Sequence, residues 1–169
     1  MFSEKRGVFV TLNLARAAGE RLRGCIGFPY PVKQLAEGIG EAAAMAATED
    51  PRFEPVSEGE LRSIVVEVSV LTVPRRLNPG DRKELPSKVE IGRDGLIVSN
   101  RFASGLLLPQ VATDFRMDAT EFLCQACMKA GLTPDSWLDK EVEVDTFQAD
   151  IFAEVEPLGE VKRVRLRES

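Results

Sequence analysis

Histidine is absent from the 169 residues of this chain. Without an imidazole, Ser-His-Asp and Cys-His catalysis are both excluded. The common catalytic zinc sites use histidine as a ligand, so they are excluded as well. Any proton transfer therefore falls to Glu, Asp, Lys, Cys, the single tyrosine or water.

Long apolar runs and a basic charge balance are missing too. No stretch reaches about 18 apolar residues, so we expect no transmembrane helix, and no signal-like segment opens the chain. Three cysteines, an odd number, favour reduced thiols and a cytoplasmic location. The net charge of -5 argues against non-specific binding to nucleic acid and disfavours an anionic membrane surface as partner.

The most distinctive stretch that is present is Leu22–Gly27. Gly24 and Gly27 flank Cys25, and strand alternation would place Arg23 on the same face as the thiol. Glycine inside a strand usually marks a β-bulge, or the close approach of a ligand or of another backbone. The pattern therefore indicates either a binding site or a buried cysteine with glycines for tight packing.

Hydrophobic periodicity predicts seven strands and two longer helices. Residues 74–88 are expected to form a long surface loop, and a slip in alternation at Asp145-Thr146 predicts a β-bulge. The tail from Val161 fits either a last edge strand or a solvated basic tail. The order of elements favours an α+β fold built from antiparallel hairpins. The spacing of Asp118 and Glu121 predicts a capping box at the start of the second helix. The predicted strands are 7–12, 21–26, 62–73, 89–91, 95–99, 105–108 and 141–156, and the helices are 31–48 and 118–130.

Two polar side chains, Glu67 and Ser69, share one face of the predicted strand over residues 62–73. In a chain without histidine, Glu67 or water would have to act as the base for a Cys25 nucleophile. We hypothesise that the two groups face one cleft within a hydrogen bond or one water of each other. Arg23 would favour the thiolate.

Further candidates each have two interpretations. Arg52, within Asp50-Pro51-Arg52-Phe53, could clamp a phosphate or carboxylate, or form a structural salt bridge to Asp50 or Glu54. Arg93 could belong to an anion-binding turn, or to a simple hairpin turn at Gly92–Gly95.

Two more signals are weaker. Gln110, after a strand end, could orient a polar ligand or satisfy local backbone. The C-x-x-C formed by Cys124 and Cys127 lies inside a predicted helix, where core packing is favoured over a redox or metal pair.

Six segments, in order, resemble the AMMECR family, which is named for the candidate region of a human syndrome and is widespread in archaea and bacteria. The resemblance implies one domain over residues 1–169 with an α+β fold. Two similar β/α halves would share a mainly antiparallel, barrel-like sheet, with a cleft between a larger and a smaller lobe. The segments are Leu22–Gly27, Asp50–Phe53, Glu67–Leu71, Gly92–Val98, Gly105–Ala112 and Cys127–Leu132.

The family has no established biochemical activity, and some relatives are fused to, or encoded beside, Memo-like and radical-SAM proteins, which indicates a modification pathway. We therefore expect a cleft for a small or anionic ligand centred on Leu22–Gly27. The alternatives are a cysteine-dependent enzyme and a non-catalytic module that binds a nucleotide, another anion or a protein. No metal site is indicated, and the sequence does not identify a cofactor. The candidate catalytic residues are Cys25 and Glu67, and the candidate ligand contacts are Arg23, Gly24, Gly27, Arg52, Ser69, Arg93 and Gln110.

Overall fold

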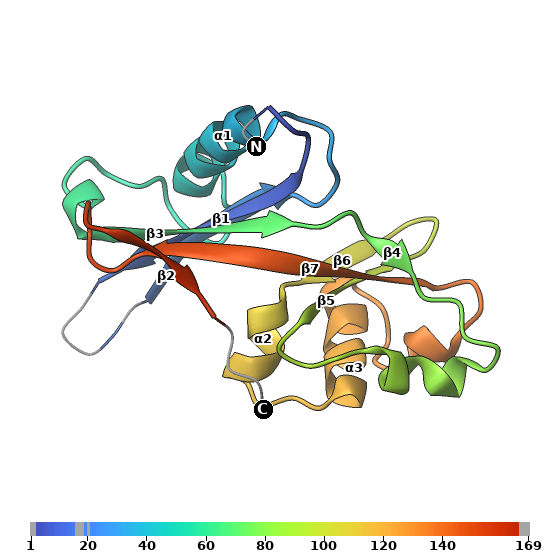
Figure 1. The fold of residues 1–169 in the computed structure, drawn as a ribbon. Coiled ribbons are helices and arrows are strands. Elements are labelled where there is room, and N and C mark those ends of the chain that lie inside the picture. Colours follow the sequence, from blue (N-terminus) through green and yellow to red (C-terminus); the bar gives the residue numbers. More distant parts are fainter. Residues whose placement is uncertain (1–2, 16–18, 20, 166–169) are drawn as a thin grey trace. The chain divides into compact units, whose positions relative to one another are not determined.

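The computed structural model describes residues 3–15, 19 and 21–165, in which helices are combined with a mainly antiparallel, curled sheet (Figure 1). The α+β class expected from the sequence is confirmed. The chain divides into two compact units. Among the described residues, unit 1 comprises those up to residue 73 together with residues 150–165, and unit 2 comprises residues 74–149. No helix among the described residues is both long and apolar enough to cross a membrane.

Unit 1 is a twisted antiparallel sheet with one helix on one face (Figure 1). The strands run in the order β2-β1-β3, followed by the end of β7, and β8 pairs with residues 151–154 of β7. The strands are β1 (Gly7–Leu14), β2 (Arg21–Phe28), β3 (Ile64–Leu71), β7 (Glu143–Glu154) and β8 (Val161–Val164); the helices are α1 (Leu35–Thr48) and the short η1 (Leu61–Ser63).

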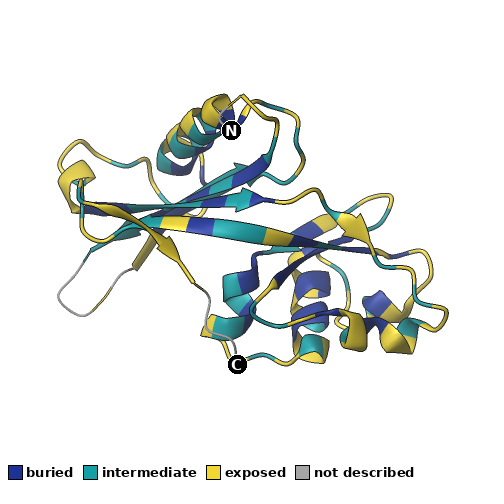
Figure 2. Ribbon diagram, viewed as in Figure 1, coloured by how far each residue is buried: buried dark blue, intermediate teal, exposed yellow. Residues whose placement is uncertain are grey.

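Helix α1 packs through its small residues onto the sheet. Ala42 and Ala46 are fully buried against Val10 and Leu12 of β1, and Figure 2 shows this buried side of the helix. Alanine gives high helix propensity and lets the two backbones approach closely. The helix begins at Leu35 rather than at residue 31, so the predicted first turn was placed too early.

A β-bulge interrupts the hairpin of β1 and β2. Leu12 pairs with Gly24 and Asn13 pairs with Leu22, so Arg23 is an extra residue without a partner across the strands. A bulge redirects one side chain and locally breaks the alternation of the strand. The simple alternation that placed Arg23 beside Cys25 therefore does not hold.

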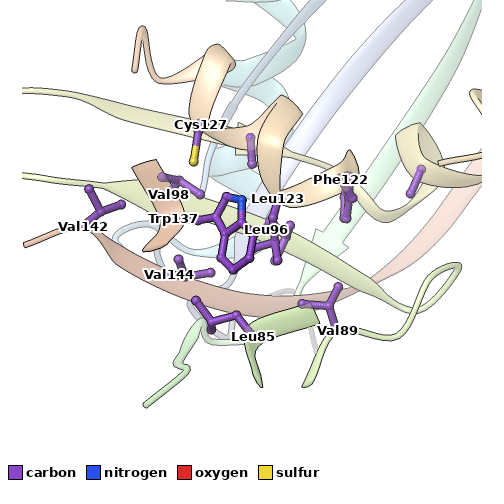
Figure 3. Close-up of a cluster of buried hydrophobic side chains, with 12 residues drawn as sticks. Leu85, Val89, Leu96, Val98, Phe122, Leu123, Cys127, Trp137, Val142 and Val144 are labelled. Carbon is purple, nitrogen blue, oxygen red and sulfur yellow. The ribbon is translucent and has the colours of Figure 1, made fainter. Parts of the chain in front are cut away.

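Unit 2 surrounds an apolar core, in which Trp137 packs among leucine, valine and phenylalanine side chains (Figure 3). Helix α3 begins with the predicted capping box between Asp118 and Glu121, and Gly131, with φ of +77°, follows its end. Besides the start of β7, the elements are β4 (Arg75–Arg76), η2 (Arg82–Lys88), β5 (Asp94–Ser99), β6 (Ser104–Leu107), α2 (Pro109–Asp114), α3 (Ala119–Lys129) and η3 (Ser136–Leu138).

Two predictions for unit 2 were wrong at its start. Residues 74–88 lie mostly at the surface, but they are not a simple loop, because they contain β4 and η2. Leu85 is fully buried, and Arg82 donates to the carbonyl oxygens of Trp137 and Val142. Residues 89–91 do not form a strand either, since the Asp94 carboxylate accepts from the backbone N–H of Glu90 and closes a turn there.

The bulge predicted in β7 is also wrong. Residues 143–148 pair with β5 without a shift in register. Val144 faces the apolar core, whereas Phe147 packs on Gly95, where a Cβ atom would lie 2.3 Å from the ring. The face of β7 that is buried changes along the strand. The apolar residues therefore lose their simple alternation, although the pairing register does not shift. The tail after Val161 begins as the edge strand β8, and residues 166–169 lie outside the described part.

Candidate functional site

Three side chains form a row across unit 1. Thr11 of β1 pairs with Cys25 of β2 on one side and with Glu67 of β3 on the other. Directly paired residues point to the same face, here the face opposite α1. The Thr11 hydroxyl donates to Sγ of Cys25 at 3.3 Å. With strands about 4.8 Å apart, Cys25 and Glu67 share a face but have Thr11 between them.

Ser69 lies two residues along β3 from Glu67, so it points to the same face. It is buried, with 1% of its surface exposed. Glu67 and Ser69 therefore share one face of β3, as strand alternation predicts. The Cys25 thiol lies on that same face of the sheet.

The loop after α1 connects directly to the strand that carries Cys25. The buried carboxylate of Asp50 accepts from the Cys25 backbone N–H at 2.9 Å. It also accepts from Arg52, at 2.9 Å from Nε and 2.6 Å from Nη2. Of the two alternatives for a salt bridge of Arg52, the structure has the one to Asp50. The Arg52 guanidinium and the Cys25 N–H hold the pKa of the Asp50 carboxyl far below its usual range, although burial opposes this.

Arg52 remains accessible despite this ion pair. Its side chain is 46% exposed, compared with 2% for Asp50. The guanidinium carbon lies 5.4 Å from the ring centroid of Phe53. A cation at this distance from an aromatic ring is attracted to the ring. Arg52 is therefore a fixed cation that solvent can reach.

Arg23 is occupied elsewhere, as the bulge directs it toward residues 54–60. It is buried and donates to both carboxylate oxygens of Glu60, at 2.9 and 3.2 Å, and to the carbonyl oxygens of Glu54 and Pro55. These contacts hold the pKa of Glu60 at about 2, with the Arg23 hydrogen bond as the main cause. Arg23 thus ties the sheet edge to the 54–60 segment.

The groups around the Cys25 thiol shift its pKa in opposite directions. Burial raises its pKa above the ordinary value, and the negative charges of Asp50 and Glu67 add to this. The Thr11 hydrogen bond and the charge of Arg52 act in the opposite direction but do not overcome burial. The cation that acts on the sulphur is Arg52, whereas the sequence suggested Arg23.

Both glycines of the Leu22–Gly27 segment are explained by close packing. A Cβ atom at Gly24 would lie 2.0 Å from the carbonyl oxygen of Ala46 in α1. At Gly27 it would lie 2.2 Å from the carbonyl oxygen of Val8 and 2.5 Å from the Phe9 ring. Neighbouring chain therefore fills the space that the sequence suggested for a ligand at these two positions.

Two of the candidate ligand contacts belong to unit 2. Arg93 forms ion pairs with Glu90 and with the buried Asp94, which are local to the turn before β5. Gln110 is the second residue of α2. The remaining candidates all belong to unit 1.

The C-x-x-C pair lies within α3, as expected for core residues. Cys127 is fully buried, and burial raises its pKa to about 11. Cys124 packs partly against the same core. Among residues 3–15, 19 and 21–165, no three Cys, Asp or Glu side chains are grouped to hold a metal ion.

Sequence reasoning missed Thr11 and Asp50 as members of the site. Thr11 is found only through strand pairing, which connects residues 14 positions apart. Asp50 carried a signal, because an aspartate before proline at a helix end often accepts local backbone N–H groups. It also accepts the backbone N–H of Arg52, at 3.1 Å.

Comparisons with known proteins agree on one family. The AMMECR1 family model matches residues 1–152. A protein of Methanosarcina barkeri is 53% identical over 161 residues, covering 95% of this chain and 77% of its own length. One of Methanocaldococcus jannaschii is 51% identical over 166 residues, or 98% of this chain and 82% of its own. The crystal structure of the uncharacterized protein PH0010 from Pyrococcus horikoshii is 49% identical, with a TM-score of 0.93, and the match covers 98% of this chain and 81% of that one. This chain therefore belongs to the AMMECR1 family.

Proposed function

We propose that unit 1 binds a small anionic molecule through Arg52, beside the thiol of Cys25. One observation carries the proposal: the Arg52 guanidinium is half-exposed, yet it is fixed by the buried Asp50 carboxylate. That same carboxylate holds the backbone of Cys25. Cation and thiol are therefore positioned by a single buried group.

A fixed guanidinium is well suited to this task. Arginine recognises carboxylate and phosphate groups through paired N–H donors in a planar fork. A free arginine side chain loses rotamer entropy when it binds, and Asp50 has already removed much of that freedom in Arg52. Binding to a preorganised donor therefore costs less free energy than binding to a mobile surface arginine.

The thiol in this proposal is a contact for the ligand. Because burial raises the pKa of Cys25, the neutral S–H form predominates near pH 7. A neutral thiol is a weak hydrogen-bond donor and a small apolar surface. It would contact the uncharged part of a molecule whose anionic group lies at Arg52.

A panel of phosphates, carboxylates and nucleotides tests the proposal by thermal shift and calorimetry. We expect at least one class to stabilise the protein, and Arg52→Gln to abolish the effect. Arg62→Gln is the matched control, because Arg62 is an exposed arginine of the same unit. Equal binding by wild type and Arg52→Gln, or no stabilisation of wild type by any anion, would contradict the proposal.

A second function, cysteine-dependent catalysis, is favoured by the row of Cys25, Thr11 and Glu67. The Thr11 hydroxyl, which donates to Sγ in the structure, lies between thiol and carboxylate. To relay the proton it would turn to donate its own hydrogen to Glu67 while it accepts the S–H proton of Cys25. Alkylation of Cys25 should then slow in Glu67→Gln, although loss of the Glu67 charge alone would lower the Cys25 pKa and speed the reaction. Labelling that is unchanged or faster in Glu67→Gln supports the binding role alone.

A modification pathway with Memo-like or radical-SAM partners is a further proposal, and it rests on the family resemblance. The anionic group would then be part of a molecule handed between proteins. Affinity purification of such a partner with wild type, but not with Arg52→Gln, would support this role. Equal recovery with both would separate the partner from the Arg52 site.

A further inference from the structure

We infer that the ligand presents an oxyanion, a carboxylate or phosphate group, to the end of the Arg52 guanidinium, and that Asp50 is the positioning residue that leaves this end available. The inference rests on the proposed function, whose site it shares. It adds the ligand chemistry, the direction of approach and the role of a second residue.

A guanidinium has two edges at which two N–H groups point in parallel. The side edge consists of Nε and one N–H of Nη2, and the far end consists of Nη1 and the other N–H of Nη2. Asp50 occupies the side edge of Arg52, with Oδ1 at 2.9 Å from Nε and Oδ2 at 2.6 Å from Nη2. Within residues 3–15, 19 and 21–165, Nη1 of Arg52 forms no hydrogen bond. The far end is therefore the open one.

Asp50 cannot readily turn away, because its accepting capacity is used on every side. Oδ1 accepts from the backbone N–H and from Nε of Arg52, at 3.1 and 2.9 Å. Oδ2 accepts from the Cys25 backbone N–H and from Nη2 of Arg52. A carboxylate offers about four lone-pair directions, and all four are used here. The orientation of Arg52 is thus set by β2 as well as by its own loop.

The ion pair also determines which anions are attracted. Asp50 and Arg52 together carry no net charge, so a halide gains little from simple electrostatics at this point. An oxyanion gains two parallel N–H bonds at the far end, which a spherical ion cannot form in the same geometry. The site should therefore select for geometry rather than for charge alone.

Arginine side-chain NMR tests this arrangement in the full chain. The probes are sodium phosphate, sodium acetate and sodium chloride at matched ionic strength. In wild type we expect phosphate or acetate to shift the Nη signals of Arg52 at least threefold more than its Nε signal, and chloride to shift neither. The acetate and phosphate titrations show which oxyanion binds more tightly.

Asp50→Asn tests the positioning role. Without the carboxylate, the side edge becomes available and the guanidinium gains rotational freedom. We expect the preference for oxyanion over chloride to fall at least fivefold, and the Nε signal to respond together with Nη. Arg62→Gln should retain the wild-type pattern. If Asp50→Asn does not fold, the wild-type ratio of Nη to Nε shifts decides the inference by itself.

The outcomes separate the two claims. If no anion shifts Arg52 or stabilises the wild type, both the proposed function and this inference fail. If phosphate or acetate binds but shifts Nε as much as Nη, the ligand displaces Asp50 from the side edge. That result overturns the inference and leaves the proposed function standing. Unchanged selectivity in a folded Asp50→Asn protein would overturn the positioning role.

Discussion

The surroundings of Cys25 in unit 1 and of Cys127 in unit 2 show two ways of burying a thiol. Cys127 lies among apolar side chains, where burial is the main cause of its raised pKa (Figure 3). Cys25 is also held above its ordinary pKa by burial, but a hydroxyl, a guanidinium and two carboxylates modify it. The Trp137 backbone N–H and the charge of Arg82 also lower the pKa of Cys127, but burial outweighs them. Unit 2 is thus stabilised by hydrocarbon packing at this point, whereas unit 1 combines packing with fixed charge.

The largest expected effect is on the apolar core of unit 2. Phe122→Ala removes a fully buried ring and should lower the free energy of unfolding by about 3–5 kcal/mol. Phe102→Ala is the matched control, because this ring is 94% exposed and its loss should change stability by less than about 0.5 kcal/mol. Urea unfolding followed by Trp137 fluorescence measures both. Similar losses in the two variants would show that the unit 2 core does not carry this stability.

The close approach of strand and helix in unit 1 gives the next largest effect. Gly24→Ala brings a Cβ atom onto the Ala46 carbonyl oxygen and should cost about 3 kcal/mol. Gly40→Ala, in the same unit, meets no atom within 4 Å and should stabilise α1 by about 1 kcal/mol. Opposite signs in urea unfolding followed by circular dichroism are expected. A tolerated Gly24→Ala would mean that β2 can move away from α1.

The ion pair of Asp50 and Arg52 in unit 1 predicts that the free energy of unfolding depends on pH. The apolar packing of unit 2 predicts no such dependence. The pKa of Asp50 is lowered in the folded protein, so its ion pair stabilises above the ordinary carboxyl pKa and is lost as the pH falls. Asp50→Asn should cost about 1–2 kcal/mol at pH 7, and this difference should shrink between about pH 4 and about pH 2. Phe122→Ala, measured in parallel by urea unfolding, should cost the same throughout. If the loss of stability in Asp50→Asn did not change with pH, the Asp50 charge would not be its cause.

The smallest effect concerns the thiols themselves. Thr11→Val removes the hydrogen bond that favours the Cys25 thiolate, and should slow alkylation of Cys25 about threefold, as for a bond worth about 0.6 kcal/mol. Cys127 should label far more slowly than Cys25 and be unaffected, as it is fully buried. Mass spectrometry after timed alkylation gives both rates. Faster labelling in Thr11→Val would mean that the methyl-for-hydroxyl change opens the site.

Local patterns in the sequence were sufficient for most elements and for one side of the site. The capping box at Asp118 and the shared face of Glu67 and Ser69 follow from spacing alone. Alternation failed at Arg23, because a bulge depends on how two strands pair. It failed again in β7, where residues on both faces are buried. Alternation of apolar residues therefore does not identify one face of this strand as the core face.

The remaining differences come from contacts between distant parts of the chain. Leu85 is buried because helix α3 and η3 pack around η2, which no local pattern within residues 74–88 records. Arg52, rather than Arg23, lies beside the thiol because its loop is bound to β2. Asp50 of that loop, 25 residues from Cys25, accepts the Cys25 backbone N–H. The spacing in the sequence placed Arg23 beside the Cys25 thiol, whereas the cation that acts on the thiol in the structure is Arg52.

Strand β7 has a consequence for synthesis and for dissection of the protein. Residues 143–149 belong to unit 2, whereas residues 150–154 and the strand β8 belong to unit 1. When only the first 73 residues have left the ribosome, β1, β2 and β3 are present. The strand β7, which pairs beside β3, is still missing, and so is the Glu154 carboxylate that accepts the Val66 N–H. Unit 1 can therefore be completed only after unit 2 has been translated. A fragment ending at Val73 would present the free edge of β3 to other chains.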